Sequence, residues 1–213
     1  MELESEIKKA IEKVEVIQTE QENVNHSIWL ERISFRIALI STFIALAIVL
    51  GYLLVQIPNI ELFTLTIFLS GIILGKRDGM IVGLLSSFIF CFFNPFGASP
   101  LPLLAFQLGY YSLVGLMGAL ISSLFKKKRI INFDDDMYKF SIIVILGFIG
   151  AFMTLNFQVI STLIDVLTYG TINQFIPRFL TGAIFTIVHI IGNTLGFIFL
   201  LPGLIQLLNK MLY

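Results

Sequence analysis

The stretch FSIIVILGFIGAFMTLNFQVISTLIDVL, residues 140–167, decides the class of fold. It carries no charge before Asp165, and at about 1.5 Å per residue a helix of this length exceeds the roughly 30 Å hydrocarbon core of a bilayer. The whole chain shares this character, because 57% of its 213 residues are hydrophobic and 13% are charged, against about 25% charged residues in soluble domains. This composition is that of an all-α integral membrane protein and excludes a disordered chain, a nucleic-acid-binding protein and an ordinary soluble enzyme.

Five further apolar stretches accompany this one and predict six transmembrane helices in total. The predicted spans are Phe35–Ile57, Ile60–Gly75, Met80–Phe93, Leu103–Phe125, Phe140–Leu167 and Phe175–Leu200. The second and third are short, so one re-entrant hairpin is an alternative. We favour two spans, because Lys76, Arg77 and Asp78 between them are costly in hydrocarbon unless they reach water. The sixth span is expected to end before Pro202 and to leave a short amphipathic tail.

The basic residues predict the orientation of these spans. With the N-terminus in the cytosol, 13 of the 14 Lys and Arg residues lie on the cytosolic side, as the positive-inside rule requires. Arg178 is the exception and lies at the outer side. We therefore expect a multi-pass protein of the cell membrane with both termini in the cytosol.

Residues 1–33 form a separate predicted domain. Positions 1–22 hold seven Glu and three Lys, and they lack the basic start, apolar core and cleavage site of a signal peptide. Apolar residues recur at heptad spacing, with Leu3, Ala10, Ile17 and Val24 on one seam. The pattern predicts a cytosolic amphipathic helix resembling a coiled coil, which either packs on the protein itself or serves as a docking or dimerising helix. Residues 34–213 form the six-helix transmembrane domain.

Polar residues gather in the outer halves of the last three spans and in the outer loops. In the fifth span Ile142–Met153 contains nothing more polar than Gly, whereas Gln158, Thr162, Asp165 and Tyr169 follow on one helical face. Aromatic residues accompany them, and an aromatic cavity with a few polar groups suits a small organic ligand. The candidate substrate-binding residues are Asn59, Glu61, Asn94, Gln107, Tyr110, Tyr111, Asn156, Gln158, Asp165, Arg178, His189 and Asn193.

Each of these residues also has a structural interpretation. Arg178 would suit a carboxylate or phosphate, but it could instead pair with Asp165 across the gap between the fifth and sixth spans. A single histidine such as His189 is often a hydrogen-bonded packing residue. Aromatic residues near the membrane surface form an ordinary interfacial belt.

No motif in the sequence indicates enzymatic chemistry. It contains no His-Glu-x-x-His, no phosphate-binding Gly-Lys-Ser/Thr loop and no paired intramembrane carboxylates. We therefore expect no catalytic residue, no metal site and no cofactor in this chain. Any active transport must draw its energy from a partner or from an ion gradient.

Short motifs after the first span carry a family resemblance. They are Ile57-Pro58-Asn59-Ile60-Glu61-Leu62, Phe68-Leu69-Ser70-Gly71, Leu74-Gly75, Gly79, Val82-Gly83 and Asn94-Pro95-Phe96-Gly97. Over about residues 35–201 the chain resembles the substrate-binding S component of an energy-coupling factor (ECF) vitamin transporter. The resemblance implies that residues 34–213 are a substrate-binding domain that captures a vitamin or precursor at an outward-facing pocket. It implies as partners a membrane coupling protein and two cytosolic ATPases, which use the ATP.

The resemblance also implies a partner-contact surface on the first span. In the family, an Ala-x-x-x-Ala pattern there meets the coupling protein, and here Ala38, Ser41, Thr42 and Ala45 form a looser version of it. The loop at Asn59–Glu61 would lie at the pocket mouth and could act as a gate. Two other functions remain as alternatives: a self-sufficient small-solute carrier, and a scaffolding membrane protein that works through its N-terminal helix.

Overall fold

The computed structural model describes residues 32–54, 57, 61–127 and 137–212, and these residues form helices without any strand. The all-α expectation is confirmed for this part of the chain. The predicted N-terminal helix, apart from its last two residues, and Asn59 lie outside the described residues. The helices in chain order are α3 (Ile33–Leu54), α4 (Phe63–Leu74), α5 (Lys76–Phe92), α6 (Leu101–Lys127), α7 (Phe140–Tyr169), α8 (Phe175–Thr181), α9 (Ala183–Leu195) and α10 (Leu201–Leu212).

Each of the six predicted spans contains at least one helix within the described residues, but these helices differ in length. Four helical stretches are long and apolar enough to cross a bilayer: Ile33–Leu54, Leu101–Lys126, Phe140–Tyr169 and Ala183–Leu212. Helix α4 has 12 residues, or about 18 Å, which is shorter than the hydrocarbon core. Helix α5 has 17 residues and begins with the charged run Lys76, Arg77 and Asp78. The structure thus supports four spans by length, and a six-span topology with cytosolic termini stays a prediction.

Helix α4 is short because it is the core of the molecule rather than a lipid-facing helix. Every residue from Phe63 to Ile73 is buried, and α3, α5, α6 and α10 all pack against it. Phe63 and Phe68 are completely buried, and Phe68 lies 5.2 Å from the ring of Phe197 in the last helical stretch. A helix that is apolar all round is stable when its neighbours cover every face.

Close packing of α4, α5 and α6 depends on glycine. Gly75, with φ of 90°, reverses the chain between α4 and α5. A Cβ on Gly115 of α6 would overlap the carbonyl oxygen of Gly79 in α5, and a Cβ on Gly83 would overlap that of Tyr111. The backbones of α5 and α6 therefore touch directly, because residues with small side chains let helices approach closely.

The sixth helical stretch does not end before Pro202, so that prediction was wrong. A π-helical turn, Gly196–Leu200, joins α9 to α10, and the helix continues through Pro202 to Leu212. The amide of Leu201 donates to the carbonyl of Gly196, five residues earlier. Proline normally disrupts a helix because its ring meets the preceding turn and its nitrogen has no hydrogen. The wider π turn just before Pro202 accommodates both effects.

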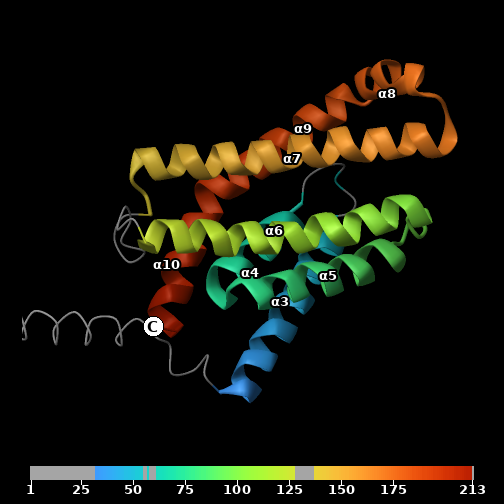
Figure 1. Ribbon diagram of the computed structural model, residues 1–213. Coiled ribbons are helices and arrows are strands. Elements are labelled where there is room, and N and C mark those ends of the chain that lie inside the picture. Colours follow the sequence, from blue (N-terminus) through green and yellow to red (C-terminus); the bar gives the residue numbers. More distant parts are fainter. Residues whose placement is uncertain (1–31, 55–56, 58–60, 128–136, 213) are drawn as a thin grey trace, which may run out of the picture.

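Two groups of helices build the molecule. Helices α3, α4, α5 and α6 pack on one another, while α7 packs along α9 and the π turn. Figure 1 shows α7 running beside α6, with α8 near the C-terminal end of α7 and the chain terminus at the opposite end of the molecule. Glu61, at the start of the α4 segment, contacts α9, so a polar contact joins the two groups.

Candidate functional site

A cluster of five polar side chains, which we call the polar centre, lies where the two groups of helices meet. Its members are Glu61, Thr64, Thr154, His189 and Asn193. Thr64 Oγ1 donates to Glu61 Oε1 at 2.5 Å, and His189 Nε2 lies 3.2 Å from the same oxygen. Asn193 Nδ2 donates to Thr154 Oγ1 at 2.8 Å, and Asn193 also lies within hydrogen-bonding reach of Glu61. The polar centre is thus one connected network.

The polar centre draws its members from distant parts of the sequence. His189 and Asn193 lie four residues apart, on one face of α9. Glu61 precedes α4 and is 128 residues from His189 in the chain, while Thr154 comes from the middle of α7. The network is buried, since the side chains of Glu61 and His189 are 17% and 10% exposed.

Several buried polar atoms in and near this centre have no hydrogen-bond partner among the described residues. They are Gln107 Oε1, His189 Nδ1, Asn193 Oδ1 and Thr194 Oγ1. Most buried polar groups in proteins are hydrogen-bonded, so each such atom needs an explanation. Two of these atoms belong to the polar centre itself, and their side chains are already oriented by other bonds.

An aromatic wall borders the polar centre. Tyr111 stands edge-on to Phe63, with ring centroids 4.9 Å apart, and Phe157 of α7 lies 5.1 Å from the ring of Tyr110. Both tyrosines lie within electrostatic reach of Glu61. The Tyr110 hydroxyl donates to the carbonyl of Met153 at 2.5 Å and so ties α6 to α7. The aromatic wall, made of Phe63, Tyr110, Tyr111 and Phe157, thus packs next to a carboxyl group.

A groove of about 400 Å³ lies between α6 and α7. Its walls are mainly apolar, with Leu113 and Met117 from α6 and Phe152 from α7. Tyr110 and Asn156 supply its polar side chains. The predicted site residues Tyr110 and Asn156 therefore share a surface, and Tyr110 also belongs to the aromatic wall.

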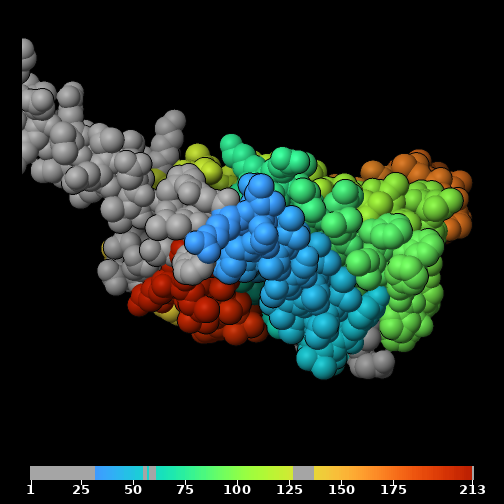
Figure 2. Space-filling view, turned by 90° about the horizontal axis from the view of Figure 1, so that it is seen from below, coloured from blue at the N-terminus to red at the C-terminus, as the bar shows by residue number. Residues whose placement is uncertain are grey.

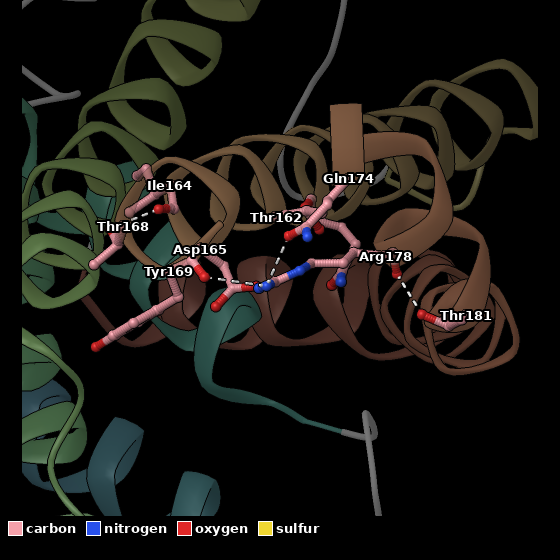
Figure 3. Close-up of polar contacts among 9 residues, drawn as sticks. Thr162, Ile164, Asp165, Thr168, Tyr169, Gln174, Arg178 and Thr181 are labelled. Atoms are coloured by element: carbon pink, nitrogen blue, oxygen red, sulfur yellow. Dashed lines mark hydrogen bonds and ion pairs between the residues drawn. The ribbon is translucent and has the colours of Figure 1, made fainter. Parts of the chain in front are cut away.

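Arg178 and Asp165 form an ion pair with each other. From the sequence, this pair was the alternative to a contact between Arg178 and a ligand. Arg178 Nη1 lies 2.5 Å from Asp165 Oδ2, and Nη2 donates to Gln174 Oε1 at 3.2 Å. Figure 3 shows the guanidinium held between these side chains, where α8 meets the end of α7. The pair is partly exposed, at 35% for Arg178 and 46% for Asp165. It fastens α8 to α7, and a contact between Arg178 and a ligand stays a prediction.

The remaining predicted residues lie apart from the polar centre or shape the backbone. Asn94 Oδ1 accepts a hydrogen bond from the amide of Phe96 at 2.9 Å, so this side chain stabilises the turn after α5. Gln158 is partly buried in α7, and its carbonyl accepts hydrogen bonds from Ser161 and Thr162. Gln107 is partly buried in α6. The structure thus brings together Glu61, Tyr110, Tyr111, His189 and Asn193 from the predicted set.

The four predicted partner contacts on α3 are all exposed. They are Ala38, Ser41, Thr42 and Ala45, and Thr42 Oγ1 bonds to the carbonyl of Ala38 within the same helix. Figure 2 shows the surface of α3, in blue to cyan, uncovered by the other described helices on this side. Residues with small side chains therefore form an open stripe along this helix.

Sequence reasoning missed Thr64 and Thr154 in the polar centre, and the ion pair between Arg36 and Asp78. Thr64 follows Glu61 by three residues, which is one helical turn and could have been recognised. Arg36 bonds both carboxyl oxygens of Asp78, with Nη2 to Oδ1 at 2.9 Å, and so joins α3 to α5. No local pattern links Thr154 to Asn193, because they contact only through the packing of α7 on α9.

Comparison with protein families matches residues 35–212 to the family described as ECF transporter, substrate-specific component. Searches of curated proteins and of solved structures returned no match to this chain. The family match covers all the described helices from Phe35 onward, including every member of the polar centre. The chain therefore belongs to the substrate-specific components of ECF transporters, membrane subunits that bind a small-molecule substrate and work with an energising module.

Proposed function

We propose that this chain captures a small organic micronutrient, a vitamin or vitamin precursor, at a pocket that opens to the outside. It then delivers the molecule inward together with a membrane coupling protein and two cytosolic ATPases. Family membership supports the role of a substrate-binding subunit. The specific pocket, the class of substrate and the partner proteins are parts of the proposal.

The polar centre is the observation that carries this proposal. Four of the helical stretches are long and apolar enough to cross a bilayer, and buried polar groups in such a setting are costly unless they perform a task. Here they include a carboxyl group and two side chains with unpartnered buried atoms, His189 and Asn193. Aromatic side chains with a few oriented polar groups are typical of small-molecule pockets, and the groove between α6 and α7 shares Tyr110 with the aromatic wall.

We assign the ligand contacts to two zones. The inner zone consists of the polar centre with Gln107, Tyr110 and Tyr111, and Asn156 extends it into the groove between α6 and α7. The outer zone consists of residues near the pocket mouth, namely Asn59, Asn94, Gln158, Asp165 and Arg178. The Arg178–Asp165 pair would shape this mouth by holding α8 against α7.

The proposed partner surface is the exposed small-residue stripe of α3. Small side chains let another helix approach closely, which is the usual basis of helix association in membranes. The proposed topology has six crossings and both termini in the cytosol, and it places 13 of 14 Lys and Arg residues inside. In this arrangement α4 crosses as a short helix sheltered by its neighbours.

Identification of the bound molecule is the experiment that tests this function. The protein is purified in mild detergent and denatured, and the released small molecules are analysed by mass spectrometry. We expect a vitamin-like compound in stoichiometric amount, strongly reduced in Asn193→Ala and retained in Ser123→Ala. Ser123 is a suitable control because its hydroxyl bonds to Ala119 within α6, away from the polar centre.

Uptake assays then separate the proposal from its alternatives. Uptake of the identified compound should require the ATPase module. Uptake without it would indicate a self-sufficient carrier. A protein that releases nothing and binds none of a panel of vitamins and precursors would contradict the proposal. Deletion of residues 1–30 should leave capture intact, whereas a scaffolding protein would lose its function.

A further inference from the structure

We infer that the substrate presents a positively charged nitrogen group that donates hydrogen bonds to the polar centre. This inference rests on the proposed function and adds the charge class of the substrate. It follows from three features of the polar centre: which of its atoms lack partners, which charges surround Glu61, and what kind of surface stands beside it.

The unpartnered atoms of the polar centre are hydrogen-bond acceptors. An ionised carboxyl group only accepts hydrogen bonds, so His189 Nε2, 3.2 Å from Glu61 Oε1, carries the hydrogen. In neutral His189 the other ring nitrogen, Nδ1, is then an acceptor, and it is buried without a partner. Asn193 uses its amide nitrogen on Thr154, which leaves Oδ1 as a second buried acceptor. Counted over the whole residue, His189 and Asn193 are only 8% and 2% exposed.

With His189 neutral, an ionised Glu61 gives the polar centre a net negative charge. Within the described residues, the groups that act on Glu61 are His189, Thr64 and Asn193, and none of them is Lys or Arg. Hydrogen bonds donated to a carboxyl group favour its ionised form. Arg178, the basic residue that the sequence places at the outer side, is already bonded to Asp165 and Gln174. An acidic substrate would therefore bring a second negative charge to Glu61 without a cation to balance it.

The aromatic wall suits the same kind of ligand. Tyr111 and Phe63 stand edge to face, Phe157 stacks on Phe106, and Phe157 meets Tyr110 edge to face. Aromatic faces attract cations through their quadrupole, and they also stack on planar rings. The expected substrate is thus a planar ring that bears an amino, amidine or protonated heterocyclic nitrogen.

Benzamidine and benzoate provide a matched pair of probes for this inference. They share one ring and one planar substituent of similar size, but benzamidine is a cation that donates hydrogen bonds and benzoate is an anion that accepts them. Binding of each is measured by thermal shift and by calorimetry on the purified full chain. We expect benzamidine to raise the unfolding temperature and benzoate to have no effect.

Two variants and one control test whether benzamidine binds at the polar centre. Glu61→Gln should weaken benzamidine binding by about 30-fold or more, because one member of a buried charge pair is lost. Asn193→Leu should also weaken benzamidine binding, because it removes the unpartnered amide oxygen while keeping a side chain of similar size. Asp135→Asn makes the same acid-to-amide change in the acidic run 134–136 and should leave binding within about twofold.

The outcomes distinguish this inference from the proposed function. Preference for benzoate, or an acidic compound released from the purified protein, would overturn the charge assignment and leave the capture function intact. Unchanged benzamidine binding in both Glu61→Gln and Asn193→Leu would also overturn it. A protein that binds neither probe and releases no compound would contradict both, and ordered water would then account for the unpartnered atoms.

Discussion

Arg36 and Arg178 each bond to one aspartate, but their partners differ in burial. The side chain of Asp78 is 4% exposed and that of Asp165 is 46% exposed. Arg36→Ala leaves a buried carboxyl group without its partner, so we expect a loss of about 3 kcal/mol in the free energy of unfolding. Arg178→Ala should cost less than about 1 kcal/mol, as exposed pairs do. Chemical unfolding of both purified variants in detergent measures the difference.

A double variant provides the control at this scale. Asp78→Asn combined with Arg36→Ala removes the unpaired charge, so it should recover part of the stability lost in Arg36→Ala alone. If Arg36→Ala and Arg178→Ala lowered the free energy of unfolding equally, the burial of Asp78 would not be the cause of the larger loss expected for Arg36→Ala.

At the scale of the helices, the direct backbone contact between α5 and α6 leads to a prediction. Gly115→Ala would place a Cβ against the backbone of Gly79, which forces the two helices apart, whereas Gly109→Ala in the same helix meets nothing within 4 Å. We expect Gly115→Ala to destabilise the protein by about 1–3 kcal/mol through overpacking. Gly109→Ala should be neutral or stabilising by up to about 1 kcal/mol, because alanine favours helix. Thermal unfolding that ranks the two variants in the opposite order would contradict this packing.

At the scale of the whole molecule, the exposed stripe on α3 predicts how the subunit assembles. Ala45→Trp replaces a small exposed side chain with a large one, so it should block close approach of the coupling protein. We expect uptake to fall by about tenfold or more, while ligand binding by the isolated subunit stays unchanged. Val144→Trp is the matched control, because Val144 is also exposed but lies on α7. Uptake that is equally impaired in both variants would count against this surface.

The helical content, the four long spans and the family resemblance could be predicted from the sequence. Apolar length is a property of each segment taken alone, so runs such as Phe140–Leu167 indicate a span without knowledge of the rest of the chain. Gly79 and Gly83 stand at a small-residue spacing that permits close helix contact, but only the structure shows that they meet the backbone of Gly115 and Tyr111 in α6. The prediction failed at Pro202, because proline is a local signal and the π turn that accommodates it depends on the surrounding helices.

The membership of the polar centre was decided by tertiary structure alone. The sequence named Glu61, His189 and Asn193 as polar residues in an apolar chain, but their contact joins segments 128 residues apart. Thr154 joins them because α7 packs against α9, and Arg178 pairs with Asp165 because α8 folds back on α7. Hydropathy is additive along the chain and can be summed from the residues. The convergence of side chains depends on how whole helices pack, and no local pattern contains that information.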